Sequence, residues 1–464
     1  MEKPSLASEL AGTAAVVLED QIDLLNYRRD ASVCAAGDPA AAVLVNSAEE
    51  IVRVVKAARE ADQPVYIRGA GSTYAGGANP TRGGIVIDVS PMNRIVEIDR
   101  GRGLVIVEPG VTYGELLAVL GRDGLTIGIV PLTGASGTIG GAIASHGLGT
   151  GSPKYQSTGD EVAGLEVILP DGELLRTGSA ALAGAGFFQR YAIGPDLTGL
   201  FLGANGTLGV ITKLALWVHP LPPHQETLTL GFSDYAAGAR FTAHAQLHEM
   251  FRNVWYGAGY EDKAVAARVS AARPDLDGNS MPGFCLGLDL RGDPREVAAD
   301  RLRLIDQASR FAGGEFAPFD EIFFSKLRRD FSFWYGYAGY FSRSMCALLM
   351  TSMPTETSPR FFALVDRMRA LHPDFVWAGG TVLCRRGVHG AVIMFYDEQH
   401  QWPAAQAAAS ATCAELLEIG CVPYKVGKMW APLMDRFGSY YRTLRALKRS
   451  FDPKSLFGPD NLAL

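Results

Sequence analysis

The sequence contains no pair of cysteines with the CxxC or other short spacing of a metal site or redox centre. Its six cysteines are scattered along the chain, as Cys34, Cys285, Cys346, Cys384, Cys413 and Cys421. Scattered thiols of this kind are typical of a protein in a reducing compartment and not of a disulfide framework. We therefore expect free thiols and no metal site.

A strongly basic stretch and a long apolar run are also missing. The 464 residues carry a net charge of −6 without a Lys/Arg-rich stripe, which argues against a nucleic-acid partner. The N-terminal Ala/Val run, ended by Glu19 and Asp20, is too short and polar for a secretory signal, and no later run has the length of a membrane span. These absences predict a cytoplasmic protein with no membrane partner.

The length predicts two or three domains. Residues 1–30 are expected to form an N-terminal helical arm. Strand-like and helical runs alternate over 31–222, where Ser47 precedes an amphipathic helix and Asp171-Gly172 predicts a β-hairpin turn. Composition changes after the prolines at 220–223, so 223–430 is predicted to be a second, substrate-side domain and 431–464 a C-terminal segment returning to the first.

Two glycine-rich segments lie in the first domain: RGAGSTYAGG (68–77), which we name the first cradle, and TGASGTIGGAIASHGLGTG (133–151), the second cradle. Glycine allows a backbone to approach a ligand closely, and successive N–H groups in such turns form a nest suited to a diphosphate. The spacing matches neither the P-loop nor the Rossmann fingerprint, which argues against a nucleoside-triphosphate enzyme and an NAD-type dehydrogenase. Two cradles separated by a strand–helix unit suit an extended dinucleotide.

Several runs resemble one known family. They are VYIRGAGSTYAGGANPTRGGIVIDVSPMNRIVEID, VIVEPGVTYGELLAVL, LEVILPDGELLRTG and GPDLTGLFLGANGTLGVITK, with PYKVGKMWAPLMDRFG and LKRSFDPKSLFGP near the C-terminus. They are similar to the family of vanillyl alcohol oxidase and p-cresol methylhydroxylase (PCMH). The resemblance implies an α+β fold with a PCMH-type FAD-binding domain and a cap domain built on an antiparallel sheet. It implies FAD bound by Gly69, Ala70, Gly71, Ser72, Thr73, Tyr74, Pro131, Ser136, Gly137, Gly140, Gly141, His146, Gly147, Gly206, Val210 and Ile211.

The resemblance also implies catalytic positions. Phenol-oxidising members hold the substrate as phenolate with two tyrosines and an arginine, and the matching positions are Tyr74, Tyr424 and Lys425. Hydroxyl groups beside a cation favour a bound anion, although lysine lacks the bidentate geometry of arginine. The alternative is a packed Tyr424 and a salt-bridged surface Lys425.

This sequence departs from the family at the acidic residue beside the flavin, where it has Leu132. Without that carboxylate, a non-phenolic alcohol or a hydroxy acid held by Lys425 stays open. His389 is the candidate base, since an ordinary histidine can accept a proton near neutral pH. A structural role for His389 is the alternative.

Other features are less specific. His146 could contact the flavin or be an ordinary loop histidine. His244 and His248 have the spacing of a zinc pair, but without a third ligand we expect a solvated helix face. The aromatic run at 331–341 could line a substrate pocket or belong to a core.

We therefore expect an FAD-dependent oxidoreductase that takes a hydride from a small alcohol or phenol-like substrate. A 2-hydroxy-acid dehydrogenase and a flavin-binding protein without turnover are the alternatives. FAD is expected to be non-covalent, because the first cradle has no histidine or cysteine and no histidine occurs between His248 and His372. The only candidate tethers are His146, Tyr337 and Tyr340. Oxygen or a protein is the expected electron acceptor, and a homodimer is the candidate assembly.

Overall fold

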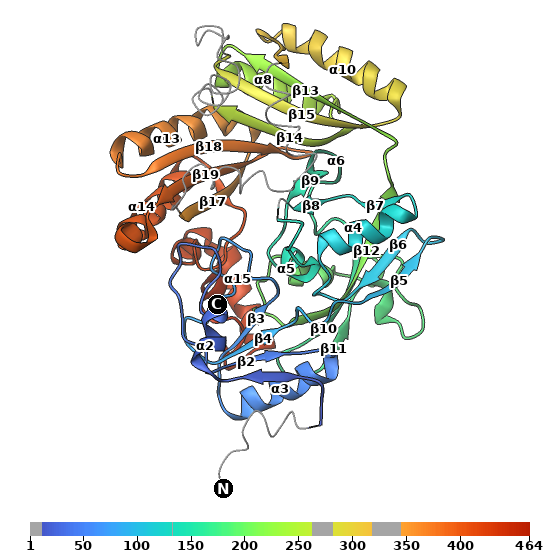
Figure 1. Cartoon of the computed structure of the whole chain (residues 1–464), viewed down its shortest axis with the longest axis vertical. Coiled ribbons are helices and arrows are strands. Elements are labelled where there is room, and N and C mark those ends of the chain that lie inside the picture. The colour runs from blue at the N-terminus through green and yellow to red at the C-terminus, as the bar shows by residue number, and fades with distance from the viewer. Residues whose placement is uncertain (1–11, 132, 262–281, 318–344) are drawn as a thin grey trace.

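The computed structural model describes residues 12–131, 133–261, 282–317 and 345–464 (Figure 1). These residues form a two-domain α+β fold. The N-terminal domain carries two sheets, and the cap domain carries a third, larger sheet. Figure 1 shows the cap above the N-terminal domain, with the C-terminal helix returning to the lower part.

The first sheet has the order β1-β2-β4-β3. Strands β2, β4 and β3 run parallel, and the edge strand β1 pairs antiparallel with β2. Helix α3 packs its apolar side on this sheet and begins at Ser47, whose hydroxyl accepts from the Glu50 N–H as an N-cap. The elements are β1 (Val16–Leu18), α2 (Gln21–Leu24), β2 (Ala41–Leu44), α3 (Ala48–Glu60), β3 (Val65–Arg68) and β4 (Ile85–Asp88).

The second sheet is antiparallel, with the order β11-β10-β12-β6-β5, and β7 pairs with β12. A short pair, β8 and β9, lies beside it. The strands are β5 (Ile95–Asp99), β6 (Leu104–Val107), β7 (Leu125–Ile127), β8 (Val130–Pro131), β9 (Gly149–Thr150), β10 (Val162–Ile168), β11 (Leu174–Arg176) and β12 (Val210–Pro220). The helices are α4 (Tyr113–Arg122), α5 (Ile139–Ala144), α6 (Ser152–Tyr155) and α7 (Thr198–Phe201).

The cap sheet has the order β16-β13-β15-β14-β18-β19-β17-β20, and its paired strands are antiparallel. Its strands are β13 (His224–Phe232), β14 (Val254–Glu261), β15 (Phe284–Gly292), β16 (Gly313–Glu315), β17 (Met345–Met353), β18 (Val376–Leu383), β19 (Val388–Tyr396) and β20 (Val422–Pro423). Helices α8 (Tyr235–Leu247), α10 (Pro294–Ser309), α13 (Ser358–Leu371) and α14 (Glu398–Glu418) contribute with these strands to one apolar core.

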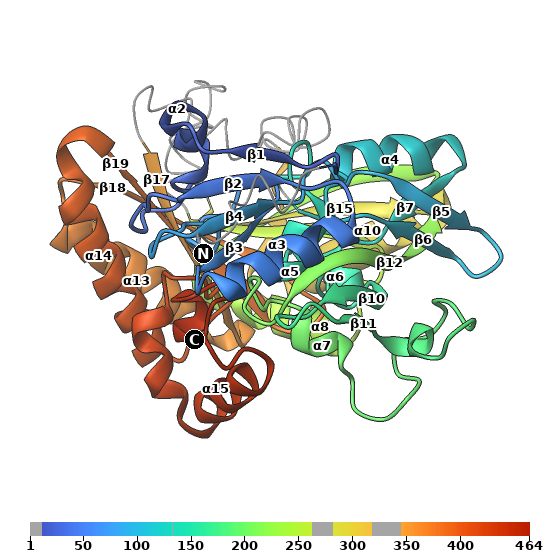
Figure 2. The same ribbon diagram turned by 90° about the horizontal axis from the view of Figure 1, so that it is seen from below.

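The chain returns to the first sheet after the cap. Helix α15 (Gly438–Phe451) ends before Pro453, and Phe457 then forms a parallel bridge with Val65. Lys448 is 2% exposed and donates hydrogen bonds to the carbonyls of Thr207 and Phe457 and to the Asp452 carboxylate, at 2.6 to 2.7 Å. The C-terminal segment is therefore part of the N-terminal domain (Figure 2).

The expected N-terminal helical arm is wrong for the described part of residues 1–30. Val16–Leu18 form strand β1, and only the single turn of α2 and a 3₁₀ turn at Leu25–Tyr27 are helical. The run AAVVL is apolar without helical spacing, and pairing with β2 satisfies its backbone. The expected hairpin at Asp171-Gly172 is confirmed, with Gly172 at a φ of 90°.

Candidate active site

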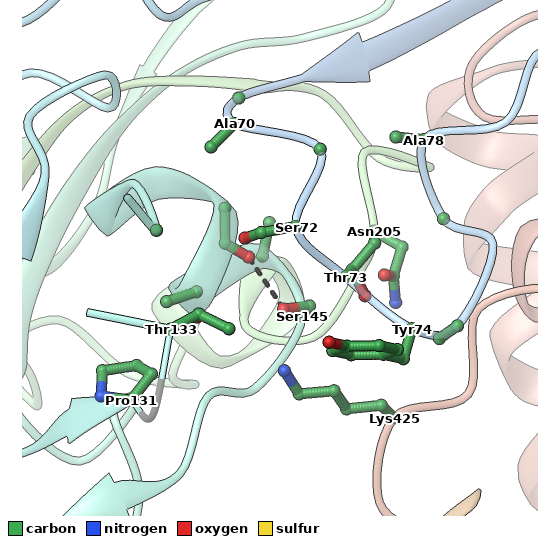
Figure 3. A pocket seen from close by; sticks show the side chains of 18 of the residues that line it. Ala70, Ser72, Thr73, Tyr74, Ala78, Pro131, Thr133, Ser145, Asn205 and Lys425 are labelled. Atoms are coloured by element: carbon green, nitrogen blue, oxygen red, sulfur yellow. Dashed lines mark hydrogen bonds between the residues drawn. The ribbon is translucent and has the colours of Figure 1, made fainter. Parts of the chain in front are cut away.

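A cavity of about 390 Å³ lies between the two domains. Its floor comes from the first and second cradles and from the loop at 204–211. Its roof comes from one face of the cap sheet, and the segment after β20 closes one end with Tyr424, Lys425, Met429 and Trp430. Figure 3 shows the first cradle on one side of this space and Pro131 and Thr133 on the other.

The first cradle offers backbone donors without acceptors. Among the described residues, none accepts a hydrogen bond from the backbone N–H groups of residues 69–73. Ala70 is exposed, the other four residues are half-buried, and all five line the cavity. A run of unpaired backbone donors at a cavity wall suits a ligand rich in acceptors. Gly71 has a φ of +64°, and a Cβ added there would lie 2.2 Å from an Arg68 guanidinium nitrogen. The positive φ therefore favours glycine at this position.

The second cradle differs from the first, because its backbone N–H groups donate hydrogen bonds to acceptors within the protein. Those of Gly137, Gly140 and Gly141 donate to the Thr133 carbonyl, the Pro109 carbonyl and the Thr138 hydroxyl. A Cβ at Gly140 would lie 2.5 Å from the Pro109 Cβ, so glycine lets α5 pack on that turn. This segment supplies shape and surface to the cavity.

The remaining floor comes from Asn205, Gly206, Gly209 and Ile211. Asn205, Thr133 and Ser145 also line the cavity, although the sequence did not mark them as cofactor-binding residues. The Ser145 hydroxyl donates to the Gly141 carbonyl at 2.8 Å, drawn as a dashed line in Figure 3. The only signal in the sequence was the presence of small polar residues in glycine-rich turns. That signal does not distinguish residues that line a cavity from residues that only form the turn.

Most of the residues expected to bind the cofactor line the cavity. They are Gly69, Ala70, Gly71, Ser72, Thr73, Tyr74, Pro131, Gly137, Gly140, Gly141, Gly206 and Ile211.

Four residues expected to bind the cofactor lie outside this wall. Ser136 is exposed on a turn, Gly147 donates its N–H to the Ala142 carbonyl, and Val210 is buried in the core under the first sheet. The His146 ring packs against Gly203 and Gly159, where added Cβ atoms would lie 2.6 Å and 3.3 Å from it. Packing and backbone hydrogen bonds within the protein thus explain why these four residues do not line the cavity.

The roof of the cavity is apolar. Cys346, Leu348 and Met350 alternate along β17, and Ile393 and Phe395 face the same side from β19. Side chains two residues apart share one face of a strand, and the helices α13 and α14 pack against the cap sheet through the core described above. Burial raises the pKa of the Cys346 thiol to about 11, so this thiol stays protonated near neutral pH.

Two of the expected catalytic residues bring polar atoms to the cavity. In Figure 3 the amine end of Lys425 and the hydroxyl end of Tyr74 point the same way, into the space beside Pro131 and Thr133. Lys425 makes no hydrogen bond or ion pair with any residue that the structure describes, and its ammonium lies 5.9 Å from the centre of the Tyr424 ring. Burial lowers the pKa of Lys425 to about 8.

Tyr424 lines the cavity, but its hydroxyl oxygen is buried and has no hydrogen-bond partner in the described chain. Burial raises the pKa of this phenol well above 10, so it stays neutral. The structure does not show the alternative of a salt-bridged surface Lys425, because Lys425 lines the cavity and forms no ion pair with a described residue.

His389 lies behind Tyr424 and outside the cavity wall. Its ring centre is 4.6 Å from that of Tyr424, and its Nδ1 lies 2.8 Å from the Ser352 hydroxyl. Burial lowers the pKa of His389 to about 3, which makes it a weak base. This placement outside the cavity wall differs from the expectation of a base that reaches the substrate and agrees with the alternative of a structural role for His389.

The described residues contain no group of three or more His, Cys, Asp and Glu side chains placed to hold a metal ion. The ring centres of His244 and His248 lie 4.4 Å apart near the end of α8, with the ring planes tilted by 50°. Leu132, Tyr337, Tyr340 and the aromatic run at 331–341 lie outside the described residues. No described helix combines the length and apolarity needed to cross a membrane.

Comparison with known proteins identifies the domain that carries the cradles. Residues 39–178 match the family model described as an FAD binding domain. This chain contains an FAD-binding domain. The residues present fit FAD. The matched region contains the unpaired N–H donors of the first cradle, and a dinucleotide with a diphosphate is a ligand rich in acceptors.

Curated relatives extend this domain assignment. An uncharacterized FAD-linked oxidoreductase of Mycobacterium tuberculosis is 32% identical over 229 residues, which are 49% of this chain and 48% of the relative. The glycolate oxidase subunit GlcD of Bacillus subtilis is 34% identical over 216 residues, 47% of this chain and 44% of the relative. The chain therefore aligns with less than half the length of these relatives.

The whole described architecture, beyond the FAD-binding domain, has a counterpart in a solved structure. The substrate-bound crystal structure of p-cresol methylhydroxylase superposes with a TM-score of 0.81 at 20% identity, covering 97% of this chain and 94% of that one. This likeness confirms the expected PCMH-type fold with its cap. The comparisons support an FAD-binding domain within a PCMH-type fold and do not single out vanillyl alcohol oxidase.

Proposed function

We propose that this chain is an FAD-dependent oxidoreductase that oxidises an alcohol or phenol-like substrate whose oxygen is held by Lys425. The observation that carries the proposal is the charge of the cavity wall. Among its described residues Lys425 is the one ammonium or guanidinium group, and none is Asp or Glu. A lone cation in an enclosed, mostly apolar space favours an anionic partner.

In this proposal each group of residues has a separate role. Residues 69–73 would hold the FAD diphosphate through their backbone N–H groups, and the second cradle would shape the space beside it. When bound, FAD supplies the two-electron redox chemistry. Lys425 in its neutral form accepts the proton of the substrate hydroxyl, because its pKa of about 8 lies close to neutral pH. The resulting ammonium then stabilises the oxyanion, with the Tyr74 hydroxyl beside it.

The cap roof favours a substrate with an apolar body. Leu348, Met350, Ile393 and Phe395 offer no hydrogen-bonding side-chain group to a second polar substituent. An aryl or alkyl alcohol with one oxygen at Lys425 fits this wall better than a small hydroxy acid does. The 2-hydroxy-acid reading stays a second candidate, because Lys425 would also meet a carboxylate and a glycolate oxidase subunit is among the relatives.

The test is an anaerobic titration of purified holoprotein, following the loss of oxidised-flavin absorbance. Separate series would add 4-alkylphenols, aryl alcohols, and lactate or glycolate. We expect the phenols or aryl alcohols to bleach the flavin, and Lys425→Met to abolish this at a pH where Lys56→Met, an exposed control, does not. Lys425→Arg keeps the charge but cannot act as a base near neutral pH.

The possible outcomes separate the candidates. Bleaching by lactate or glycolate alone would replace the proposal with the 2-hydroxy-acid reading. Failure of every series, together with no reduction of an artificial dye in steady state, would favour a flavin protein without turnover. The homodimer stays a prediction, and light scattering after gel filtration would test it.

A further inference from the structure

Lys425, Lys428 and Lys448 are all enclosed, but they differ in whether the amine has a hydrogen-bond acceptor. Lys448 donates to three acceptors, and Lys428 donates to Oδ1 of Asn461 at 2.7 Å. Lys425 has no such acceptor among the described residues, and it is the only one of the three that lines the cavity. Its nitrogen is therefore available to a molecule that enters the cavity.

We propose that Lys425 is a carbonyl-capture site, whose amine condenses with an aldehyde or a 2-oxo acid in the cavity to form an imine. The inference rests on the proposed function in one respect, because it needs the substrate end of the cavity to lie at Lys425. It goes beyond that function in assigning a covalent site and a second ligand class. Oxidation of an alcohol there would itself deliver a carbonyl compound next to the amine.

The condensation involves no redox change. The Lys425 nitrogen adds to the carbonyl carbon and gives up one proton, and the carbonyl oxygen takes up a proton to give a neutral carbinolamine. A second proton converts this hydroxyl to water, which leaves as the C=N bond forms and the nitrogen loses its hydrogen. The Tyr74 hydroxyl, which Figure 3 shows pointing the same way as the amine, can supply a proton to the departing oxygen.

Burial supports this chemistry. Lys425 has a pKa of about 8 instead of 10.5, so on the order of a hundredfold more of its amine is neutral at pH 7 than in an ordinary lysine. Desolvated lysines in apolar pockets are the ones that form imines with carbonyl compounds. An arginine, which the family resemblance implies at this position, remains protonated and would not act in this way. The capture site is thus a consequence of the lysine in this chain.

The test uses holoprotein treated with benzaldehyde or pyruvate in the presence of sodium cyanoborohydride, which reduces an imine to a stable secondary amine. Intact mass and peptide mapping then locate the added group. We expect Lys425 to be labelled first, well before the exposed Lys56. Lys428 serves as an internal control, because burial lowers its pKa to about 8 as well but it does not line the cavity.

The proposal would be overturned if Lys425 were labelled no faster than Lys56. It would also be overturned if Lys425 and Lys428 were labelled equally, because a low lysine pKa alone would then explain the labelling. Lys425→Arg should lose the label while its visible spectrum still shows bound flavin. The peptide map of the unsubstituted protein decides the question even if this variant does not fold. Because labelling requires no flavin reduction, it can succeed where the bleaching series fails, so the two proposals fail separately.

Discussion

Lys428 and Asn461 are joined by a 2.7 Å hydrogen bond from the lysine Nζ to the amide Oδ1. The amide nitrogen of Asn461 donates in turn to the carbonyls of Gly77 and Asn205, at 2.9 and 3.0 Å. One side chain, only 1% exposed, thus connects the first cradle, the loop at 204–211 and the segment that begins with Tyr424 and Lys425.

Replacement of Asn461 by alanine should therefore weaken FAD binding. The change leaves an ammonium group and two carbonyls without their partner, at a cost of about 1–3 kcal/mol for a buried group. Part of this cost should appear as a higher dissociation constant for FAD, measured by fluorescence titration of the deflavinated protein. Asn46→Ala removes an exposed asparagine elsewhere and should leave the constant unchanged. Wild-type affinity in Asn461→Ala would show that the connection does not shape the cradle.

Gly71→Ala should reduce FAD binding without a comparable loss in a matched glycine variant. A positive φ at a non-glycine residue costs about 1–3 kcal/mol, and the new Cβ would also displace the Arg68 guanidinium group. Gly121→Ala is the control, because it lies in α4 and its Cβ would meet nothing within 4 Å. Flavin content after gel filtration measures both, and full flavin content in Gly71→Ala would contradict the role of the first cradle.

Binding of an anion should weaken as the pH rises. Lys425 is an ammonium below its pKa of about 8 and neutral above it. The affinity for benzoate, read from the flavin spectrum, should be flat below pH 8 and fall about tenfold per pH unit above it. Lys425→Met should bind benzoate about tenfold to a hundredfold more weakly below pH 8, since a charge-assisted bond contributes about 1.5–3 kcal/mol. An unchanged pH profile in this variant would place Lys425 away from the anion.

The same lysine should lower the stability of the folded protein at neutral pH. Its pKa falls from 10.5 in the unfolded chain to about 8 in the folded one, so the unfolded state binds more protons between these values. The unfolding free energy contributed by this group therefore rises from pH 8 to 10.5. Lys425→Met should be more stable than the unsubstituted protein by about 3 kcal/mol at pH 7, and the gap should close towards pH 10.5. Urea unfolding without anions, with Lys56→Met as control, gives the comparison; a gap independent of pH would contradict it.

FAD should be released by acid precipitation, leaving a colourless pellet and a yellow supernatant. His146 packs against Gly159 and Gly203 outside the cavity wall, and Cys346, which does line it, holds its proton to about pH 11. Neither is therefore placed or activated as a tether. A fluorescent flavin band on a denaturing gel would contradict the prediction, and peptide mapping would identify the residue, with Tyr337 and Tyr340 as the other candidates.

Local signals in the sequence were sufficient for much of the FAD-binding domain. The Ser47 cap, the Asp171-Gly172 turn and the glycines of the first cradle each act through their own backbone, so the residue type alone predicts the local structure. Strand β1 could not be predicted in this way, because its three residues depend on pairing with β2.

The site was harder to predict where it depends on distant segments. Tyr74 and Lys425 line the same cavity only because the chain after β20 returns to the first cradle, where the Lys428 N–H donates to the Ala75 carbonyl. Asn461 contacts three segments that lie far from it in the sequence, and no motif surrounds it. The donors of the two cradles looked alike as glycine-rich runs, yet only the structure distinguishes unpaired N–H groups from those bonded to Pro109 and Thr133.

The bridge between Val65 and Phe457 has a consequence for biosynthesis. The first sheet and the first cradle are encoded early, but the strand that carries Val65 receives its last backbone partners from Leu456 and Gly458, with hydrogen bonds of 2.7 Å on both sides. During translation the cap sequence emerges from the ribosome before these partners do. One edge of the first sheet therefore stays without these backbone partners until nearly all of this sequence has been synthesised.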